Sequence, residues 1–175
     1  ASELLQWLSH TEMYRTVEGG FYKQTMFPIM PATLPEHLQY VFDQNNRNLI
    51  KQHVEQMFET DFEDQFMVTT HRLTTGEQTF IHNDYLDDPR NMKYGFTHRL
   101  IVYLNEHWEP QDGGKLGIYS SDNTDDLVYE YEPIHNTAVG LSFSPKSYHD
   151  VKKVTGGDRY TINFSFLSKQ SNYKI

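Results

Sequence analysis

The sequence predicts a mainly β fold, a sandwich or barrel with helices packed on one sheet. From residue 65 onward, apolar and polar side chains alternate with the period of two that is typical of half-buried strands. Turn residues interrupt these runs at short intervals, whereas apolar residues before residue 65 recur at helix spacing. The 175 residues suit one domain over 1–175, in which residues 1–62 supply helical and hairpin support and residues 63–168 form the β core.

Two helices and a hairpin are predicted ahead of the β core. A short helix covers residues 3–9, and residues 13–27 form a hairpin that turns at Gly19–Gly20. The segment "TLPE", which begins at Thr33, is a capping box with proline in the first turn, so a longer helix is predicted from there to about residue 60. The apolar residues expected on its buried face are Leu38, Val41, Phe42, Leu49, Val54, Met57 and Phe58.

The β core is predicted to contain strands over residues 65–73, 78–82, 97–105, 115–120, 127–132, 137–143, 148–154 and 158–167. In the last strand the alternation places Arg159, Thr161, Asn163 and Ser165 on one face and Tyr160, Ile162, Phe164 and Phe166 on the other. We interpret the polar face as the lining of a cavity and the aromatic face as the surface that packs against the long helix. The alternative is an ordinary strand with its polar face in water. Residues 99–105 divide in the same way, with Arg99, Ile101, Tyr103 and Asn105 opposite Leu100, Val102 and Leu104.

Composition excludes several classes of protein. The chain has no cysteine, so disulfides and thiolate zinc sites are excluded. A formal charge of −9 argues against a nucleic-acid partner, which needs a basic surface. Apolar runs are too short to span a membrane and the N-terminus lacks a signal-peptide pattern, so we expect a cytoplasmic protein with no membrane partner. The sequence does not predict an oligomeric state.

Three residues have the chemistry of a mononuclear iron site. His82 and Asp84 form an H-x-D pair whose side chains point the same way in a strand, and His149 is the best candidate for a third ligand. Two histidines and one carboxylate bind one face of an octahedral Fe(II) and leave three positions open. Zinc is the chemical competitor, although a zinc hydrolase also needs a general base beside its water. The histidines expected to be solvated are His10, His37, His53, His98, His107 and His135, while His71 ends a strand that enters the predicted cavity.

Arg159 has the chemistry to hold a dicarboxylate whose other end is on the metal. A guanidinium pairs bidentately with a carboxylate and stays charged at any relevant pH. Thr161 points the same way, and we expect Tyr103 to add a further hydroxyl from the facing sheet. The alternative is an exposed arginine after the turn at Gly156–Gly157.

These residues resemble those of the Fe(II)- and 2-oxoglutarate-dependent dioxygenases, in particular the prolyl-4-hydroxylase-like branch. The resemblance covers roughly residues 65–168 and depends on the segments "FIHND", "THRLIVYLNEHWEPQDGGKLGIY", "NTAVGLSFSPKSYHDVKKV" and "GGDRYTINFSF", which occur in the family's order. It implies a double-stranded β-helix, a distorted jelly roll, backed by helices. It also assigns roles: the iron ligands are His82, Asp84 and His149, and the 2-oxoglutarate site comprises Arg159, Thr161, Tyr103, Asn163 and His71. The chain departs from many members at His71, where they have a tyrosine.

The implied activity is hydroxylation of an unactivated C–H bond with Fe(II), 2-oxoglutarate and O2, with ascorbate as an optional reductant and succinate and CO2 as co-products. The substrate is a prolyl or other amino-acid residue of a peptide, or a small molecule. Residues 85–96 are either a lid over the site or a plain surface connection. Two alternatives remain open at this point: a cupin-like metal-binding barrel that does not use 2-oxoglutarate, and a non-catalytic barrel.

Overall fold

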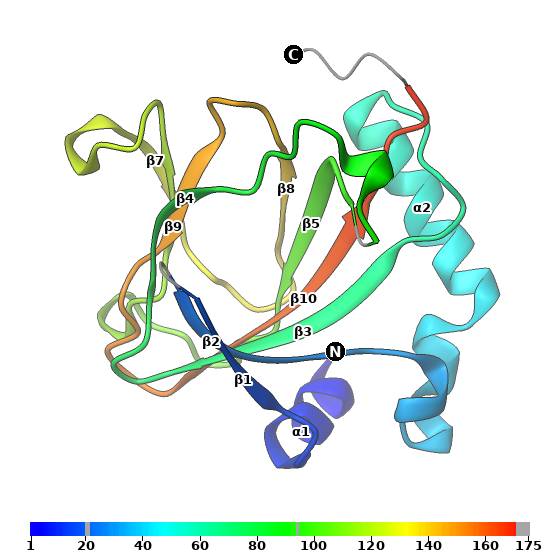
Figure 1. The fold of residues 1–175 in the computed structure, drawn as a ribbon. Helices are drawn as coiled ribbons and strands as arrows, with labels where there is room; N and C mark the ends of the chain where they lie inside the picture. The colour runs from blue at the N-terminus through cyan, green and yellow to red at the C-terminus, as the bar shows by residue number, and fades with distance from the viewer. Residues whose placement is uncertain (20–21, 94, 171–175) are drawn as a thin grey trace.

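The computed structural model describes residues 1–19, 22–93 and 95–170 (Figure 1). The helical elements are α1 (Ser2–His10), the 3-10 helices η1 (Pro31–Thr33) and η2 (Glu36–Phe42), α2 (Gln44–Phe58), and the 3-10 turns η3 (Pro89–Asn91), η4 (Pro110–Asp112) and η5 (Thr124–Asp126). The strands are β1 (Arg15–Gly19), β2 (Tyr22–Pro28), β3 (Met67–Thr74), β4 (Thr79–Asn83), β5 (His98–Tyr103), β6 (Leu116–Tyr119), β7 (Leu127–Tyr131), β8 (Ala138–Ser142), β9 (Tyr148–Val151) and β10 (Asp158–Phe166).

The strands form a double-stranded β-helix, as the resemblance implied. Their hydrogen-bonded order is β7-β6-β9-β4-β2-β3-β10-β5-β8, and β1 pairs with β2. The path bends between β2 and β4, which share one residue pair, so that two antiparallel layers face each other across a cavity (Figure 1). Each strand predicted from the period of two is present, although the one expected over 148–154 ends at Val151.

The hairpin over 13–27 is also confirmed, as β1 pairs with β2 along the whole length of β1. Gly19 ends β1, and Gly20 of the predicted turn lies outside the described residues. Because β2 lies between β4 and β3, the N-terminal segment contributes a strand to the sheet as well as helices. Across the described ranges, no helix is both long enough and apolar enough to cross a membrane.

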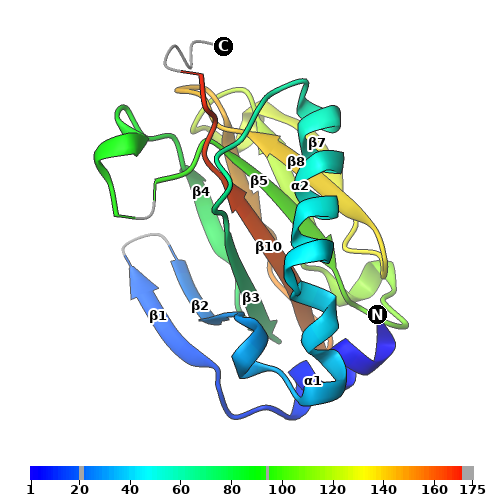
Figure 2. The same cartoon turned by 90° about the vertical axis from the view of Figure 1, so that its right-hand side faces the viewer.

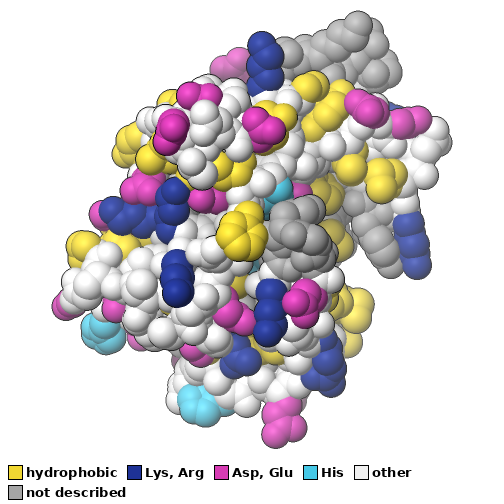
Figure 3. All heavy atoms as spheres, turned by 60° about the vertical axis from the view of Figure 1, so that its left-hand side comes forward, with side chains coloured by type: hydrophobic (Ala, Val, Ile, Leu, Met, Phe, Trp, Pro, Cys, Tyr) yellow, Lys and Arg dark blue, Asp and Glu magenta, His cyan; other side chains and the backbone are white. Residues whose placement is uncertain are grey.

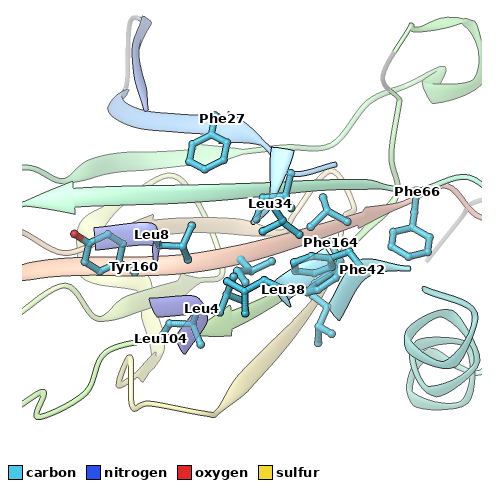
Figure 4. Packing of buried hydrophobic residues seen from close by; sticks show 14 of the residues in the cluster. Leu4, Leu8, Phe27, Leu34, Leu38, Phe42, Phe66, Leu104, Tyr160 and Phe164 are labelled. Carbon is cyan, nitrogen blue, oxygen red and sulfur yellow. The ribbon is translucent and has the colours of Figure 1, made fainter. Parts of the chain in front are cut away.

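The hydrophobic core lies between the larger sheet and the helices. In Figure 2, α2 runs across the sheet that contains β10 and β5. The aromatic face of β10 points to this side, and its Phe164 ring lies 6.1 Å from the ring of Phe42 in η2. Figure 4 shows Leu4 of α1 near Leu38, and Leu8 of α1 near Tyr160 in the same cluster. The aromatic residues predicted to face the helices do so, and this packing fixes the orientation of β10.

The prediction of one helix from residue 34 to residue 60 was wrong. The chain forms η2 and then starts afresh at α2, where Asp43 caps the new helix by accepting a hydrogen bond from the backbone N–H of Asn46 at 2.8 Å. The predicted capping box does not form, because the Thr33 hydroxyl instead donates to the carbonyl of Met30. The break changes the phase of the helix, so Leu49 and Met57 are 50% and 57% exposed rather than buried.

Candidate metal centre and co-substrate pocket

The two histidines of the candidate metal centre lie side by side on neighbouring strands. β4 and β9 are antiparallel, and their register places His82 directly opposite His149, with the ring centroids 4.3 Å apart. A bulge precedes this pair: Thr79 is opposite Val151, so β4 contains one residue more than β9 between the two pairs. The bulge allows both Thr79 and His82 to face the cavity although they are three residues apart.

Asp84 follows the end of β4 and completes a cluster of three. One potential ligand atom from each of His82, Asp84 and His149 lies within 4.8 Å of the others. The Nε2 atoms of His82 and His149 are 3.9 and 3.7 Å from the carboxylate oxygens of Asp84. Each Nδ1 lies within hydrogen-bond distance of a backbone carbonyl, that of Phe80 for His82 and that of Ser147 for His149. A proton on Nδ1 leaves Nε2 as the lone-pair nitrogen, the state in which imidazole binds a metal.

The protonation states in this cluster favour metal binding. Burial and the neighbouring His82 lower the pKa of His149 to about 4, so its imidazole is neutral at physiological pH. Burial raises the pKa of Asp84, but the positive charge of Arg99 and its hydrogen bond to Asp84 act in the opposite direction, and the pKa lies below its usual value. Two histidines and one carboxylate match the donor set of a mononuclear Fe(II) site.

Arg159 enters the cavity from β10 without an acidic partner. Its side chain is buried, its Nε donates to the carbonyl of Gly114 at 2.7 Å, and its guanidinium lies 5.1 Å from the centre of the Tyr103 ring. In the part of the chain that the structure describes, no carboxylate lies within ion-pair distance of Arg159. Gly114 has a positive φ of 71°, and a Cβ there would lie 2.8 Å from Cδ of Arg159. The second glycine of the "DGGK" segment therefore makes room for the arginine.

The cavity between the two sheets has a volume of about 200 Å³. Its lining comprises Gln24, His71, Leu73, Thr79, His82, Asp84, Arg99, Ile101, Leu116, His149, Val151, Arg159, Thr161 and Asn163. Among the described residues, the buried Tyr103 hydroxyl and the Oδ1 of Asn163 have no hydrogen-bond partner. Buried polar atoms are seldom left unpaired, so these two, with the guanidinium of Arg159 that has no acidic partner, fit a polar, anionic ligand such as 2-oxoglutarate.

His71 also lines the cavity, as its strand predicted. Its Nδ1 lies 2.9 Å from Oε1 of Gln24 and its Nε2 lies 3.1 Å from the hydroxyl of Thr69. Burial, with smaller contributions from the nearby arginines, lowers the pKa of His71 to about 3. His71 is thus a neutral hydrogen-bonding group in the wall and carries no charge that would compete with Arg159 for an anion.

Sequence reasoning missed one member of the site and misplaced one histidine. Arg99 was placed on the inward face of its strand but given no role, and its Nη1 donates to Oδ2 of Asp84 at 2.6 Å. His98 was expected in solvent but is buried between Phe58 and Phe62, with ring centroids 4.7 and 4.9 Å away. The solvent-facing prediction failed because His98 lies on the same face of β5 as Leu100, which packs into the core.

The fold and the site together define a mononuclear iron oxygenase that uses a dicarboxylate co-substrate. The model of the 2OG-Fe(II) oxygenase superfamily matches residues 67–167, which is more than half of the chain. The chain therefore belongs to this superfamily and is a 2-oxoglutarate-dependent dioxygenase with Fe(II) and 2-oxoglutarate as its cofactors. A comparison with curated proteins found no match.

Solved structures share the fold over nearly the whole chain. A Pseudomonas putida prolyl-4-hydroxylase aligns with a TM-score of 0.70 and 19% identity, over 97% of this chain and 84% of that one. A Trichoplax adhaerens prolyl hydroxylase in complex with a hypoxia inducible factor peptide fragment aligns with a TM-score of 0.71 and 15% identity, over 96% and 78%. HygX from Streptomyces hygroscopicus, with nickel and 2-oxoglutarate bound, aligns with a TM-score of 0.57 and 18% identity, over 96% and 79%. The fold is therefore that of the prolyl-4-hydroxylase-like members.

Proposed function

We propose that this protein hydroxylates an unactivated C–H bond of an amino-acid-like or peptidyl substrate and forms succinate and CO2 from 2-oxoglutarate. In this reaction one atom of O2 enters the substrate as a hydroxyl group and the other enters succinate. One observation supports the proposal most strongly: three potential iron ligands and a buried arginine without an acidic partner, remote in the sequence, line the same cavity.

We assign iron binding to His82, Asp84 and His149. Iron bound there supplies the oxidising power that cleaves the C–H bond. The chain supplies the geometry: the backbone carbonyls of Phe80 and Ser147 fix the imidazole orientations, and the β4–β9 ladder holds the two rings in register. Three protein ligands leave the remaining coordination positions to co-substrate and O2.

We assign the distal carboxylate of 2-oxoglutarate to Arg159. Nε of Arg159 is occupied by the Gly114 carbonyl, which fixes the guanidinium while its terminal nitrogens stay available. Thr161, Tyr103 and Asn163 contribute hydroxyl and amide groups around the same ligand, and His71 contributes a neutral imidazole. Their burial excludes water, which strengthens the charge-assisted bonds.

We further propose that residues 1–175 act as one dioxygenase unit in which residues 1–62 support a jelly-roll core over 63–168. The position of β2 between β4 and β3 supports a single unit, because a strand from the N-terminal segment completes the sheet of the core. Residues 85–93 cross one end of the barrel (Figure 1), where Arg90 donates to the carboxylate of Glu63 at 3.1 Å and to the carbonyl of Ser168. We keep both interpretations of this segment, a lid over the site and a plain surface connection, because it is anchored at the barrel end but none of its described residues lines the cavity.

The test has a binding stage and a turnover stage. Anaerobic titration with Fe(II) and 2-oxoglutarate is expected to give the weak visible charge-transfer band of the ternary complex. Exposure to O2 with a panel of amino acids and peptides is then expected to release succinate. Absence of the band would refute the metal and co-substrate assignment. Turnover by Arg159→Ala without any keto acid would instead favour a cupin-like oxygenase that does not use 2-oxoglutarate.

A further inference from the structure

A second arginine, Arg99, faces the cavity from β5 beside the candidate iron ligands. Its Nη1 donates to Oδ2 of Asp84 at 2.6 Å, and its Nε is 3.4 Å from the hydroxyl of Ser165. Its guanidinium lies 4.7 Å from the ring centre of Phe96 and 5.3 Å from that of Phe143. Two aromatic rings, a hydroxyl and a carboxylate therefore hold the guanidinium in one place.

Part of this guanidinium is still available to a ligand. Within the described ranges, Nη2 of Arg99 donates to no acceptor, and the side chain contributes to the cavity wall. An arginine presents five N–H donors in a rigid fork, so binding to Asp84 and Ser165 leaves donors on the cavity side. Stacking on Phe96 and Phe143 reduces the entropy that a ligand would otherwise have to overcome to order the side chain.

The charge balance of the cavity indicates what that ligand is. Arg99 and Arg159 carry two positive charges and Asp84 one negative charge, so these three side chains of the lining sum to plus one. Fe(II) and 2-oxoglutarate bring equal and opposite charges, so the loaded site keeps the same excess. A positive charge in a partly buried site favours an anionic partner.

The excess is local to the cavity. The chain as a whole carries −9, and on the face shown in Figure 3 the Lys and Arg side chains are interspersed with Asp and Glu. A cation retained beside the iron ligands of an acidic protein therefore points to the bound substrate rather than to general attraction of anions.

We propose that Arg99 binds a carboxylate of the primary substrate, so that the enzyme acts on a small carboxylic acid, free amino acids included. The proposal rests on the proposed function, because it places the substrate beside the iron and 2-oxoglutarate. An internal prolyl residue of a peptide has no charge to offer at this point, whereas the carboxylate of a free amino acid does. Binding to Arg99 would hold the C–H bonds next to that carboxylate near the metal.

The experiment measures substrate binding without turnover. The full chain is loaded with Ni(II) and 2-oxoglutarate, and both are first shown to bind. Dissociation constants are then measured by calorimetry for free L-amino acids and for the matching amides, for example L-proline against L-prolinamide. A third arm uses N-acetyl amino acids, which keep the carboxylate and lose the amine. A fourth arm uses blocked peptides with an internal aspartate.

We expect at least one amino acid to bind about 10-fold or more tightly than its amide, since a charge-assisted hydrogen bond has that effect. The N-acetyl acid should also bind more tightly than the amide if the protein recognises the carboxylate and not the amine. Arg99→Gln should abolish the preference while Arg99→Lys keeps part of it, and Arg15→Gln, at an exposed arginine of β1, should leave it unchanged.

Equal binding of acids and amides by the wild type, or binding of neither, overturns the proposal. A preference for acids that survives in Arg99→Gln also overturns the proposal, because another group would then bind the carboxylate. Preference for the internal aspartate over every free acid would assign the anion to a peptide side chain and refute the small-acid class. Failure of the wild type to bind Ni(II) and 2-oxoglutarate at all would count against the proposed function itself. The comparison of acids with amides in the wild-type protein tests the proposal even if Arg99→Gln disturbs Asp84.

Discussion

The two faces of β10 are equally buried and chemically opposite. Phe164 and its neighbours on one face are closely packed among the helices, whereas Arg159, Thr161 and Asn163 on the other border a cavity and leave polar atoms unpaired. Both faces are nearly inaccessible to water, so burial alone does not separate core from site. The difference lies in whether the buried groups find partners within the protein. Unsatisfied buried groups lower stability, and a fold keeps them where a ligand completes them.

The largest effect is expected at the metal centre on the polar side. His149→Ala removes one of the three proposed ligands and leaves two, so Fe(II) binding and succinate formation should both fall, the latter by about 1,000-fold or more. The measurement is anaerobic metal titration followed by a 2-oxoglutarate turnover assay. His53→Ala, at an exposed histidine of α2, is the matched control. Near-normal turnover in His149→Ala would exclude this residue as a ligand.

A substitution on the apolar face of β10 should instead lower the stability of the fold. Phe164→Ala leaves a cavity between β10 and η2 and should lower the free energy of unfolding by about 3–5 kcal/mol. Urea denaturation followed by circular dichroism measures the change. Val128→Ala, at an exposed position of β7, should shift it little. A loss below about 1 kcal/mol in Phe164→Ala would mean that this face is packed less tightly than the structure indicates.

Arg159→Met should separate the two sides most clearly, because its effects on binding and stability have opposite signs. Loss of the charge-assisted pairing should weaken 2-oxoglutarate binding about 100-fold. Removal of a buried charge without an acidic partner should leave the ligand-free protein as stable as the wild type or more so. Calorimetric 2-oxoglutarate titration and urea denaturation of the same sample give both numbers. A large loss of stability without loss of affinity would show a structural arginine.

The smallest effect concerns pH and a histidine on the apolar side. Burial lowers the pKa of His98 to about 4, whereas the unfolded chain protonates this group near 6.5. The unfolded state therefore binds a proton that the folded state rejects, so stability is lost as pH falls from about 6.5 to about 4. At pH 5 the exclusion of this proton from the folded state lowers the free energy of unfolding by about 2 kcal/mol. His98→Gln should flatten the dependence of the urea midpoint on pH, and the exposed His53→Gln should not. An unchanged slope in His98→Gln would assign the loss to other groups.

The sequence was most informative where periodicity and chemistry agreed. The alternation in residues 158–166 predicted both faces of β10, and the residue types of His82, Asp84, His149 and Arg159 were sufficient to suggest a shared cavity. The roles of these residues stay predictions until variants are assayed, although the structure does bring them together.

The sequence was least informative where an outcome depends on pairing between distant segments. Nothing near Arg99 indicates that it meets Asp84, because the contact depends on how β5 lies relative to the end of β4. The helix break at Asp43 was a different failure: aspartate is a favoured N-cap, so the signal was present but was overridden by a hydrophobic period that continued across it. His98 was wrongly expected in solvent because the prediction followed its polar residue type. Its position in the strand alternation, on the same face as Leu100, indicates a buried side chain.

The extra residue in β4 shows that spacing in the sequence can mislead about the face a side chain occupies. Between Thr79 and His82 the chain has one residue more than β9 has between their partners. Regular alternation would place Thr79 and His82 on opposite faces, whereas the bulge keeps both on the cavity face. Deleting either Phe80 or Ile81 would restore a spacing of two and leave the histidine opposite His149. A homologue one residue shorter here would therefore keep its candidate ligands, and a one-residue gap at this point of an alignment is no sign of a lost metal centre.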